Sequence, residues 1–302
     1  MRTRPTLTWE PTGDPPPRTT SLAEVADVVA RRRVVVLSGA GLSTESGIPD
    51  YRGEQGSLRR HTPMTYQEFV ASETGRRRYW ARSHIGWRTI ARALPNAGHH
   101  AVAALRASGH LSGVITQNVD GLHQAAGTPD VVELHGSLDR VICVGCRRTS
   151  SRAELDRRLR SANPGFDGTA TRINPDGDVE LAEDVVREFR LVGCADCGGG
   201  TLKPDVVFFG ENVPAERVRR CYDLVDDASA LLVLGSSLTV MSGLRFVRHA
   251  ARTGKPVLII NQGRTRGDAH ADVIVDLPLG RALTDLAAHL ARAGNWSGSG
   301  TA

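Results

Sequence analysis

The sequence predicts an α/β fold with a mostly parallel sheet and one inserted small module. Short apolar runs alternate with helical patterns along most of the 302 residues, which is typical of strand–helix–strand units. The segment 141–203 interrupts this rhythm, because it holds four of the five cysteines and is rich in Asn, Pro, Gly and Asp. We therefore expect this segment to form a separate small module.

Individual elements follow from local patterns. Ser21 and Glu24 have the S-x-x-E spacing of a capping box, so the first helix is expected to begin there and to run to the arginines at 31–33. The apolar run 34–37 predicts the first buried strand. Further strands are expected at 113–116, 131–134, 206–209, 231–234, 257–260 and 273–275. Helices are expected at 99–107, 215–225, 243–252 and 282–292.

Composition excludes several classes of protein. The chain is 40% hydrophobic and 24% charged, and its apolar runs are far shorter than the roughly 20 residues of a membrane span. Residues 1–20 contain acids and many prolines, which is unlike a secretory signal or a transit peptide. We expect a cytoplasmic monomer without a membrane partner, with a disordered tail at 1–20 and a flexible tail at 294–302.

The net charge of +5 raises the question of nucleic-acid binding. The basic residues are nearly all Arg, with Lys203 and Lys255 as the two lysines, and a bias this uniform points to a GC-rich genome. The clusters at 31–33 and 76–78 are therefore expected to be solvated helix faces. We expect no specific nucleic-acid partner, although a basic surface can attract acidic proteins.

Two C-x-x-C pairs predict a structural zinc site. Cys143 and Cys146 form the first pair, and Cys194 and Cys197 form the second. Each pair can present two thiolates to one metal, and four thiolates fill a tetrahedral zinc site without leaving a position open for catalysis. The separation of the pairs is longer than in an ordinary zinc ribbon, which suggests an insertion between them. Disulfides are the alternative, and without a secretion signal they are disfavoured. Cys221, alone on a predicted helix, is expected to be a small buried hydrophobe.

A glycine-rich turn follows the first predicted strand. Gly39 and Gly41 would let the backbone approach a pyrophosphate at a helix amino terminus. Thr44 stands where the third glycine of a dinucleotide fingerprint would be, and no acidic ribose ligand follows about 20 residues later. This disfavours a dehydrogenase. Taken alone, the turn is also compatible with a loop that binds no ligand.

The glycine-rich turn belongs to a longer series of motifs that resembles the sirtuin family. The series begins with GAGLSTESGIPDYRG at 39–53, TQNVDGLH at 116–123 and ELHGS at 133–137. The two cysteine pairs come next, then LKPDVVFFGE at 202–211, GSSL at 235–238 and INQG at 260–263. This resemblance covers roughly 21–293, and so many motifs in the same order are not an accident.

The resemblance implies a two-domain protein that uses NAD as its co-substrate. A Rossmann-like NAD-binding domain would comprise 21–136 and 204–293, and a zinc-binding small domain would comprise 137–203. Residues implied at the phosphates, the riboses, the nicotinamide and the adenosine are Gly39, Ala40, Gly41, Ser43, Asp50, Tyr51, Arg52, Gln117, Asn118, Asp120, Gly235, Ser236, Ser237, Asn261, Gln262, Gly263 and Leu279. Within this set, Arg52 would hold a flexible loop over NAD, and Asp120 would accept a hydrogen bond from the carboxamide.

The resemblance also implies a reaction. The carbonyl oxygen of an acylated lysine would attack C1′ of the nicotinamide ribose, which expels nicotinamide and gives an alkylimidate. His135 is implied as the general base that deprotonates the ribose diol, and Asn118 as a second catalytic residue. Water would then release the lysine and leave O-acyl-ADP-ribose. The acyl-lysine protein substrate would lie extended against Val206, Val207, Phe208 and Gly210 and against 237–241.

Finer specificity stays open. The motifs at 44–52, 78–82 and 174–179 most resemble the class II branch, which includes a mitochondrial sirtuin linked to ADP-ribosyl transfer and to removal of longer acyl groups. Tyr79 and Arg82 have the spacing of a desuccinylating pair but stand in a different context, so removal of succinyl groups is not supported. We expect the insertion between the cysteine pairs to border the acyl channel and to favour groups larger than acetyl; a surface loop is the equal alternative. Mono-ADP-ribosyl transfer and a noncatalytic NAD-sensing or nucleic-acid-binding zinc module are the other functions considered.

Overall fold

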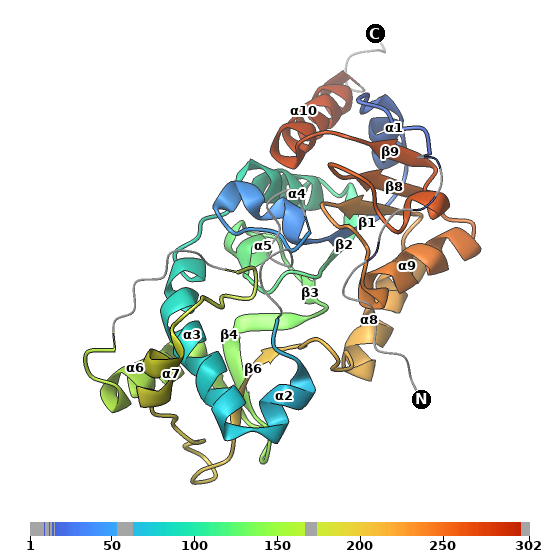
Figure 1. The fold of residues 1–302 in the computed structure, drawn as a ribbon. Helices are drawn as coiled ribbons and strands as arrows, with labels where there is room; N and C mark the ends of the chain where they lie inside the picture. Colours follow the sequence, from blue (N-terminus) through green and yellow to red (C-terminus); the bar gives the residue numbers. More distant parts are fainter. Residues whose placement is uncertain are drawn as a thin grey trace.

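The protein consists of two lobes that lie end to end (Figure 1). The structure is a computed structural model that describes residues 9, 12, 14, 16–52, 63–166 and 174–296. One lobe contains a six-stranded sheet, and the other contains a three-stranded sheet. The chain begins in the sheet lobe and visits the second lobe twice, at 66–90 and again at 136–206, returning to the sheet lobe each time.

All pairings in the six-stranded sheet are parallel, and its order is β3-β2-β1-β7-β8-β9. The strands are β1 Val34–Ser38, β2 Leu111–Thr116, β3 Val132–Glu133, β7 Ala230–Leu234, β8 Val257–Ile260 and β9 Val273–Val275. Later strands are added on one side of β1 up to β3 and on its other side from β7 onward. Such a reversal of strand order creates a crevice at the carboxyl ends of the strands, where ligands bind in α/β proteins.

Helices cover both faces of this sheet, which explains the continuously apolar strands. On β1, Val34 and Val36 pack into one core, and Val35 and Leu37 pack into the core on the opposite face. The helices of the first core are α1 Ala23–Arg31, α4 Ala97–Ala107 and α10 Leu279–Trp296. Those of the second are α8 Ala215–Asp227 and α9 Met241–Arg252. The prediction of a Rossmann-like α/β domain with an inserted module is confirmed.

The second lobe surrounds an antiparallel sheet of order β5-β4-β6. Its strands are β4 Gly136–Cys143, β5 Thr149–Ser151 and β6 Leu202–Val206. Its helices are α2 Tyr66–Ala71, α3 Glu73–Ile90, α6 Arg152–Ala162 and α7 Glu183–Glu188. Remaining short elements lie in loops of the first lobe: α5 Leu122–Ala125 and the 3₁₀ turns η1 Ala40–Leu42, η2 Thr44–Ser46 and η4 Asp268–His270.

The division between the lobes differs from the expected boundaries. We assigned all of 21–136 to the sheet domain, but α2 and α3 bury their apolar side chains in the core of the second lobe. Phe69, Tyr79 and Trp80 lie there beside the residues of β4 and β6. The strand expected at 206–209 was also placed wrongly, because β6 ends at Val206 and belongs to the antiparallel sheet.

Both ends of the sheet lobe extend further than expected. The predicted capping box is wrong: α1 begins at Ala23, and its N-cap is Leu22 without a side-chain hydrogen bond. Thr19, placed in the disordered tail, forms a parallel bridge with Val275 of β9. Helix α10 continues to Trp296, three residues into the expected flexible tail.

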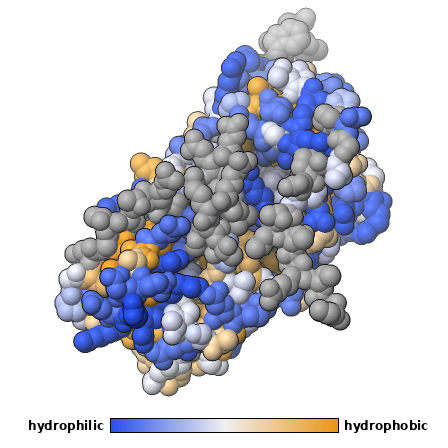
Figure 2. All heavy atoms as spheres, viewed as in Figure 1, coloured by the Kyte–Doolittle hydropathy of each residue, from blue (hydrophilic) through white to orange (hydrophobic). Residues whose placement is uncertain are grey.

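No helix in the described ranges is long and apolar enough to cross a membrane. Figure 2 shows a largely hydrophilic face over both lobes, with hydrophobic side chains gathered mainly on the lobe at its lower left. Among the described residues, the exposed large hydrophobic side chains are Val70, Leu94, Val185 and Met241, which come from separate parts of the chain.

Candidate active site and zinc centre

The predicted cofactor residues gather at the carboxyl edge of the parallel sheet. The loop after β1 carries Gly39–Ser43, and the loop after β2 carries Gln117–Asp120. Loops after β7 and β8 carry 235–237 and 261–263, and His135 follows β3. Five strands thus deliver these residues to the crevice at which the strand order reverses.

The glycines of the first loop allow the loops after β1 and β7 to touch. Gly41 N donates to the carbonyl of Gly235 at 2.9 Å. A Cβ at Gly41 would lie 2.9 Å from that same carbonyl oxygen, and a Cβ at Gly39 would lie 2.7 Å from Cβ of Ser236. No α-helix begins here, contrary to our expectation; two short 3₁₀ turns, η1 and η2, occupy 40–46. The glycines are therefore required for packing between loops before any ligand is considered.

A chain of hydrogen bonds fixes the polar side chains after β2. Asn118 is buried, and its Nδ2 donates to the carbonyl of Gly39 at 3.1 Å and to Ser43 Oγ at 3.0 Å. Ser43 Oγ then donates to Asp120 Oδ2 at 2.7 Å. Burial raises the pKa of Asp120, while hydrogen bonds from Leu122 N and from Ser43 act in the opposite direction. These side chains are held in place before a ligand arrives.

Gln117 connects the centre of this edge to the loop after β7. Its Nε2 donates to Ser236 Oγ at 2.8 Å and to the carbonyl of Ser38 at 3.2 Å. A Cβ at Gly243 of α9 would lie 2.6 Å from the amide oxygen of Gln117, so α9 also packs closely against it. The sequence resemblance named Gln117 and Ser236 separately, and the structure brings them into contact.

His135 is held as a neutral imidazole in one tautomer. Its Nδ1 lies 2.9 Å from the carbonyl oxygen of Gln117, which can only accept, so Nδ1 carries the proton. Its Nε2 lies 2.8 Å from Ser242 Oγ and accepts from that hydroxyl. Burial lowers the pKa of His135 to about 4, opposed by the hydrogen bond to Gln117 and assisted by Arg217 and Arg245. The basic lone pair is therefore on Nε2 at neutral pH.

The motif residues after the first loop lie toward the second lobe. The Tyr51 ring meets Phe209 edge-on with centroids 6.0 Å apart. Burial raises the pKa of Tyr51, and the nearby carboxylate of Asp176 raises it further. Burial lowers the pKa of the neighbouring Arg52. Asp50 comes directly before this pair, and the motif residue Gly53 lies outside the described residues.

The adenosine-side residues surround the ends of β7 and β8. Asn261 is buried, and its Nδ2 donates to the carbonyls of Gln262 and Gly263 at 2.8 and 2.9 Å. Leu279, at the start of α10, lies directly under the loop after β7, because a Cβ at Gly235 would lie 2.5 Å from its Cδ1. Leu279 therefore supports this loop from below.

Part of the backbone in the stretch expected to bind the peptide is already hydrogen-bonded within the protein. Val207 N donates to the carbonyl of His135, and Phe208 N donates to Glu211 Oε2. The carbonyl of Gly210 accepts from Gln67 Nε2. Phe208 is 8% exposed and packs in the core of the second lobe. A peptide would thus have to pair with other backbone groups of 206–210.

The four cysteines of the C-x-x-C pairs converge on one point in the second lobe. Their Sγ atoms all lie within 4.8 Å of one another, with 3.8 Å between Cys143 and Cys197 and between Cys146 and Cys194. A tetrahedral zinc with bonds of about 2.3 Å has sulfur–sulfur edges of about 3.8 Å, whereas a disulfide needs about 2.0 Å. The cluster fits the predicted structural zinc, which these four thiolates would hold.

Glycine is also required beside the metal site. A Cβ at Gly200 would lie 2.6 Å from Cys143 Sγ and 2.7 Å from Cys197 Sγ. Cys221 lies elsewhere, fully buried in α8, where burial raises the pKa of its thiol to about 12. It behaves as the buried hydrophobe expected from the sequence.

Sequence reasoning missed the residues that support the site. Ser242 stands one residue beyond the stretch expected to contact the peptide, and nothing in its type marks it as a partner of His135. Lys203 lies within a matched motif, yet its role appears only in the structure: Nζ pairs with Glu211 at 3.0 Å and lies over the Phe208 ring at 4.6 Å. This buried ammonium holds the turn 203–211 together.

Comparison with known proteins identifies the family. A model of the Sir2 family matches residues 39–242. NAD-dependent protein deacetylase 1 of Streptomyces coelicolor is 67% identical over 290 residues, which cover 96% of this chain and 97% of that protein. The chain belongs to the Sir2, or sirtuin, family. As a sirtuin it is an NAD-dependent enzyme, and NAD is its co-substrate.

More distant sirtuins agree with this assignment. NAD-dependent protein deacylase SIR4 of Batrachochytrium dendrobatidis is 44% identical over 287 residues, covering 88% of this chain and 93% of that protein. A solved complex of Sir2 with a p53 peptide and NAD+ superposes with a TM-score of 0.69 at 29% identity, covering 91% of this sirtuin and 99% of that chain. Both similarities thus extend over most of this chain and nearly the whole of the other protein.

Proposed function

We infer that this sirtuin removes acyl groups from lysine side chains of proteins, with NAD as the acyl acceptor. The observation that carries the inference is a neutral His135 at the sheet edge, one hydrogen bond from Gln117 and beside the Asn118–Ser43–Asp120 chain. The relatives named above include a deacetylase and a deacylase, which favours this reaction over mono-ADP-ribosyl transfer.

His135 is the proposed general base. With Nδ1–H donated to Gln117, the lone pair of Nε2 can accept a proton from a ribose hydroxyl. A ligand hydroxyl that takes this place must displace the hydroxyl of Ser242, which now donates to Nε2. NAD, when bound, supplies the ribose that becomes acylated and the nicotinamide that leaves. A pKa of about 4 keeps His135 unprotonated throughout the neutral range.

The remaining motif residues are proposed to bind NAD. Gly39, Ala40, Gly41, Ser43 and the serines at 236 and 237 would meet the phosphates and the adjoining ribose. Gln117, Asn118 and Asp120 would meet the nicotinamide riboside, for which their fixed hydrogen-bond chain is suited. Residues 261–263 would meet the adenosine. Asp50, Tyr51 and Arg52 would cover NAD from the side of the second lobe.

We propose a preference for acyl groups larger than acetyl. The insertion between the cysteine pairs returns along α3, where a Cβ at Gly86 would lie 2.2 Å from the carbonyl of Gly177. Arg82 pairs with Asp178 at 3.9 Å, and Asp176 is close enough to raise the pKa of Tyr51. Tyr51 contacts Phe209 of the proposed peptide-binding stretch, so the insertion has a physical route to the acyl channel.

The protein is proposed to act as a monomer in the cytoplasm, on acylated proteins. A reducing compartment keeps the four thiols of the zinc site available for the metal. The exposed large hydrophobic side chains of the described residues are scattered, which is unlike a subunit interface. Mass measurement in solution at micromolar concentration tests the oligomeric state.

A panel of acyl-lysine peptides with NAD tests the function. We expect nicotinamide, free lysine peptide and O-acyl-ADP-ribose in equal amounts, with kcat/KM higher for branched or longer acyl groups than for acetyl. Transfer of labelled adenine to protein without release of an acyl group would contradict deacylation. Equal kcat/KM for all acyl groups would contradict only the preference.

A further inference from the structure

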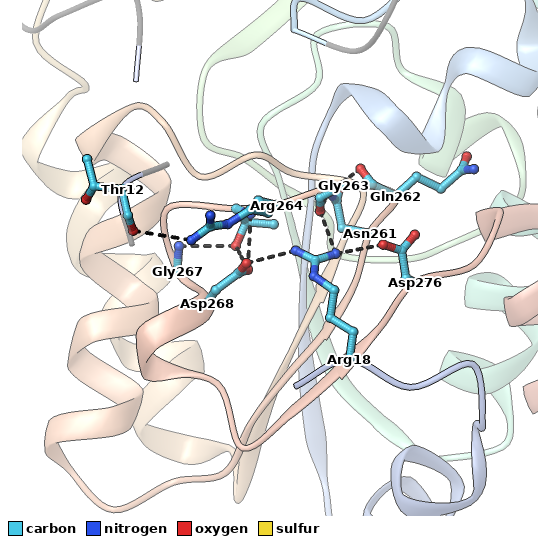
Figure 3. Close-up of polar contacts among 10 residues, drawn as sticks. Thr12, Arg18, Asn261, Gln262, Gly263, Arg264, Gly267, Asp268 and Asp276 are labelled. Atoms are coloured by element: carbon cyan, nitrogen blue, oxygen red, sulfur yellow. Dashed lines mark hydrogen bonds and ion pairs between the residues drawn. The ribbon is translucent and has the colours of Figure 1, made fainter. Parts of the chain in front are cut away.

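Arg18 of the amino-terminal segment binds the loop that follows β8 through hydrogen bonds and ion pairs. Arg18 Nη1 donates to the carbonyl of Gly263 at 2.9 Å and lies 2.9 Å from Asp276 Oδ2, and its Nη2 lies 2.8 Å from Asp268 Oδ2 (Figure 3). The guanidinium therefore ties together the start of the loop, its far end and the residue after β9. Its side chain is 16% exposed, so these bonds are shielded from solvent.

The backbone next to Arg18 fixes the position of this side chain. Thr19 N donates to the carbonyl of Ile274 at 2.9 Å, and Asp276 N donates to the carbonyl of Thr19 at 3.0 Å. The segment thus pairs with β9 at the edge of the sheet. An arginine held at its base and bonded at three points loses little further freedom, which makes its contacts effective.

Arg18 and Asn261 act on the same atom. The carbonyl of Gly263 accepts from Asn261 Nδ2 on the inner side and from Arg18 on the outer side. Asp268, which is 6% exposed, is in turn fixed by Thr265, whose N and Oγ1 donate to its Oδ1 at 3.1 and 2.6 Å. Figure 3 shows the side chain of Gln262 pointing away from Arg18, so the contact concerns the loop backbone.

We propose that Arg18 is a positioning residue for NAD, which sets the shape and charge of the adenosine side of the site from outside. This rests on the proposed assignment of 261–263 to adenosine. Two carboxylates, Asp268 and Asp276, lie against this loop, and Arg18 pairs with both. Without Arg18 the negative charge of these carboxylates would be uncompensated beside a loop proposed to bind a negatively charged dinucleotide, and the loop would lose one of its anchors.

Steady-state kinetics of the full chain test the proposal. In Arg18→Ala we expect KM for NAD to rise about tenfold, as for the loss of charge-assisted hydrogen bonds that act through a loop, with kcat and KM for the peptide within about twofold. Arg18→Lys keeps the charge but not the three-point geometry, so an intermediate KM for NAD is expected, and this milder variant also serves if Arg18→Ala does not fold. Arg281→Ala is the control, because it removes an exposed arginine of α10 that pairs only at 3.7 Å with Asp285.

A second variant distinguishes failure of the role proposed for Arg18 from failure of the adenosine assignment of 261–263. An unchanged KM for NAD in Arg18→Ala, or a loss of kcat and Tm with KM unchanged, overturns the role of Arg18. Asn261→Ala tests the premise: if it raises KM for NAD while Arg18→Ala does not, the adenosine assignment stands and the inference alone fails. If neither variant changes KM for NAD, both are overturned.

Discussion

At the residue scale, the site depends on keeping His135 neutral and correctly oriented. Its Nδ1–H is committed to the carbonyl of Gln117, and Gln117 is itself held by Ser236. The orientation of the base is therefore linked to the loop after β7, which is proposed to bind the phosphates. Binding of NAD and alignment of the base would then occur on the same scaffold.

We predict that His135→Ala reduces deacylation by about two to four orders of magnitude, the usual cost of losing a general base. The dissociation constant for NAD should stay within about threefold, because the ring bonds Gln117 only at its backbone carbonyl, and the side chain of Gln117 is held separately by Ser236. Turnover and NAD binding by calorimetry check this. His249→Ala is the control, since it removes a histidine that pairs with Asp226 away from the sheet edge. Release of the deacylated lysine peptide by His135→Ala at the parent's rate would exclude the role.

The residue types predicted the chemistry of the site but not the residues that hold the site in place. The motifs named His135, Asn118 and Asp120 because few residue types can serve as base or as fixed hydrogen-bond partners. Ser242 and Arg18 carry no such signal, because a serine or an arginine is equally common on an ordinary surface. Their roles arise from tertiary contacts with residues far away in the sequence, which no local pattern encodes.

At the element scale, the zinc module depends on the contact between the two turns that carry the C-x-x-C pairs. Cys143 ends β4 and Cys194 follows the insertion, and each is buried while its partner in the pair is exposed. The metal would join β4 to the segment leading into β6, so it would close a long insertion at its base. Binding energy at such a site is also folding energy.

We predict that Cys143→Ser lowers bound zinc from one per chain to well below one and lowers Tm by at least about 5 °C. The matched control is Cys221→Ser, which also removes a buried thiol but lies in α8, outside the cluster. That control should retain one zinc per chain even if it is less stable. Metal analysis and thermal melts measure both effects, and a zinc-free parent protein would refute the site.

The insertion between the two cysteine pairs was evident from the sequence, but its path through the structure was not. Its turn residues and its length indicated an excursion, but the sequence could not say on which side of the module it lies. The structure places 174–179 against α3, where Gly86 and Gly177 allow close backbone contact. Residues 167–173 of the insertion lie outside the described residues.

We predict that Asp178→Ala lowers the ratio of kcat/KM for longer acyl groups over acetyl by about fivefold, equivalent to about 1 kcal/mol. Losing the carboxylate releases Arg82 and weakens the hold of the insertion on α3. Glu188→Ala is the control, because it removes an exposed acid from the same insertion. Competition assays with mixed peptides give the ratio directly. An unchanged ratio with intact zinc would place acyl selection elsewhere.

At the scale of the whole molecule, apolar periodicity predicted the sheet lobe better than the second lobe. Six of the seven expected strands lie in the parallel sheet, because strands buried on both faces are continuously apolar. Helix α3 was expected only as a solvated helix face at 76–78: its 18 residues include five arginines, yet it buries Tyr79 and Trp80 against distant β-strands. Only the tertiary contacts reveal that such a helix has a core face.

A buried polar cluster lies within the sheet lobe, behind the carboxyl ends of β1 and β2, and it affects the stability of the entire fold. Ser38 Oγ donates to Thr116 Oγ1 at 2.9 Å, so the Nε2–H of His123 must donate to Ser38 Oγ, also at 2.9 Å. The His99 and His123 rings meet edge-on with centroids 5.2 Å apart. Burial lowers the pKa of His99 to about 4 and that of His123 to about 3, and each is lowered further by a neighbouring histidine.

These pKa values make the free energy of unfolding depend on pH. A histidine in the unfolded chain has a pKa near 6.5, so below that pH the unfolded state binds protons that the folded state refuses. The stabilisation is fully present above about pH 6.5 and is lost as the pH falls toward 4. Each histidine should contribute a slope of up to about 1.4 kcal/mol per pH unit in that window.

We predict that His99→Gln reduces the pH dependence of the free energy of unfolding by the equivalent of about one bound proton. Urea unfolding between about pH 7.5 and 5 measures this change. His99 Nδ1 accepts from Asn96 N in the capping box of α4, and glutamine can make the same bond, so the variant removes the titration and keeps the cap. His289→Gln is the control, because it removes an exposed histidine on a different helix, α10, and its slope should match that of the parent. If both variants show the parent's slope, His99 does not contribute to acid unfolding. The loss would then have to come from the other buried histidines or from carboxylates that are paired in the folded protein.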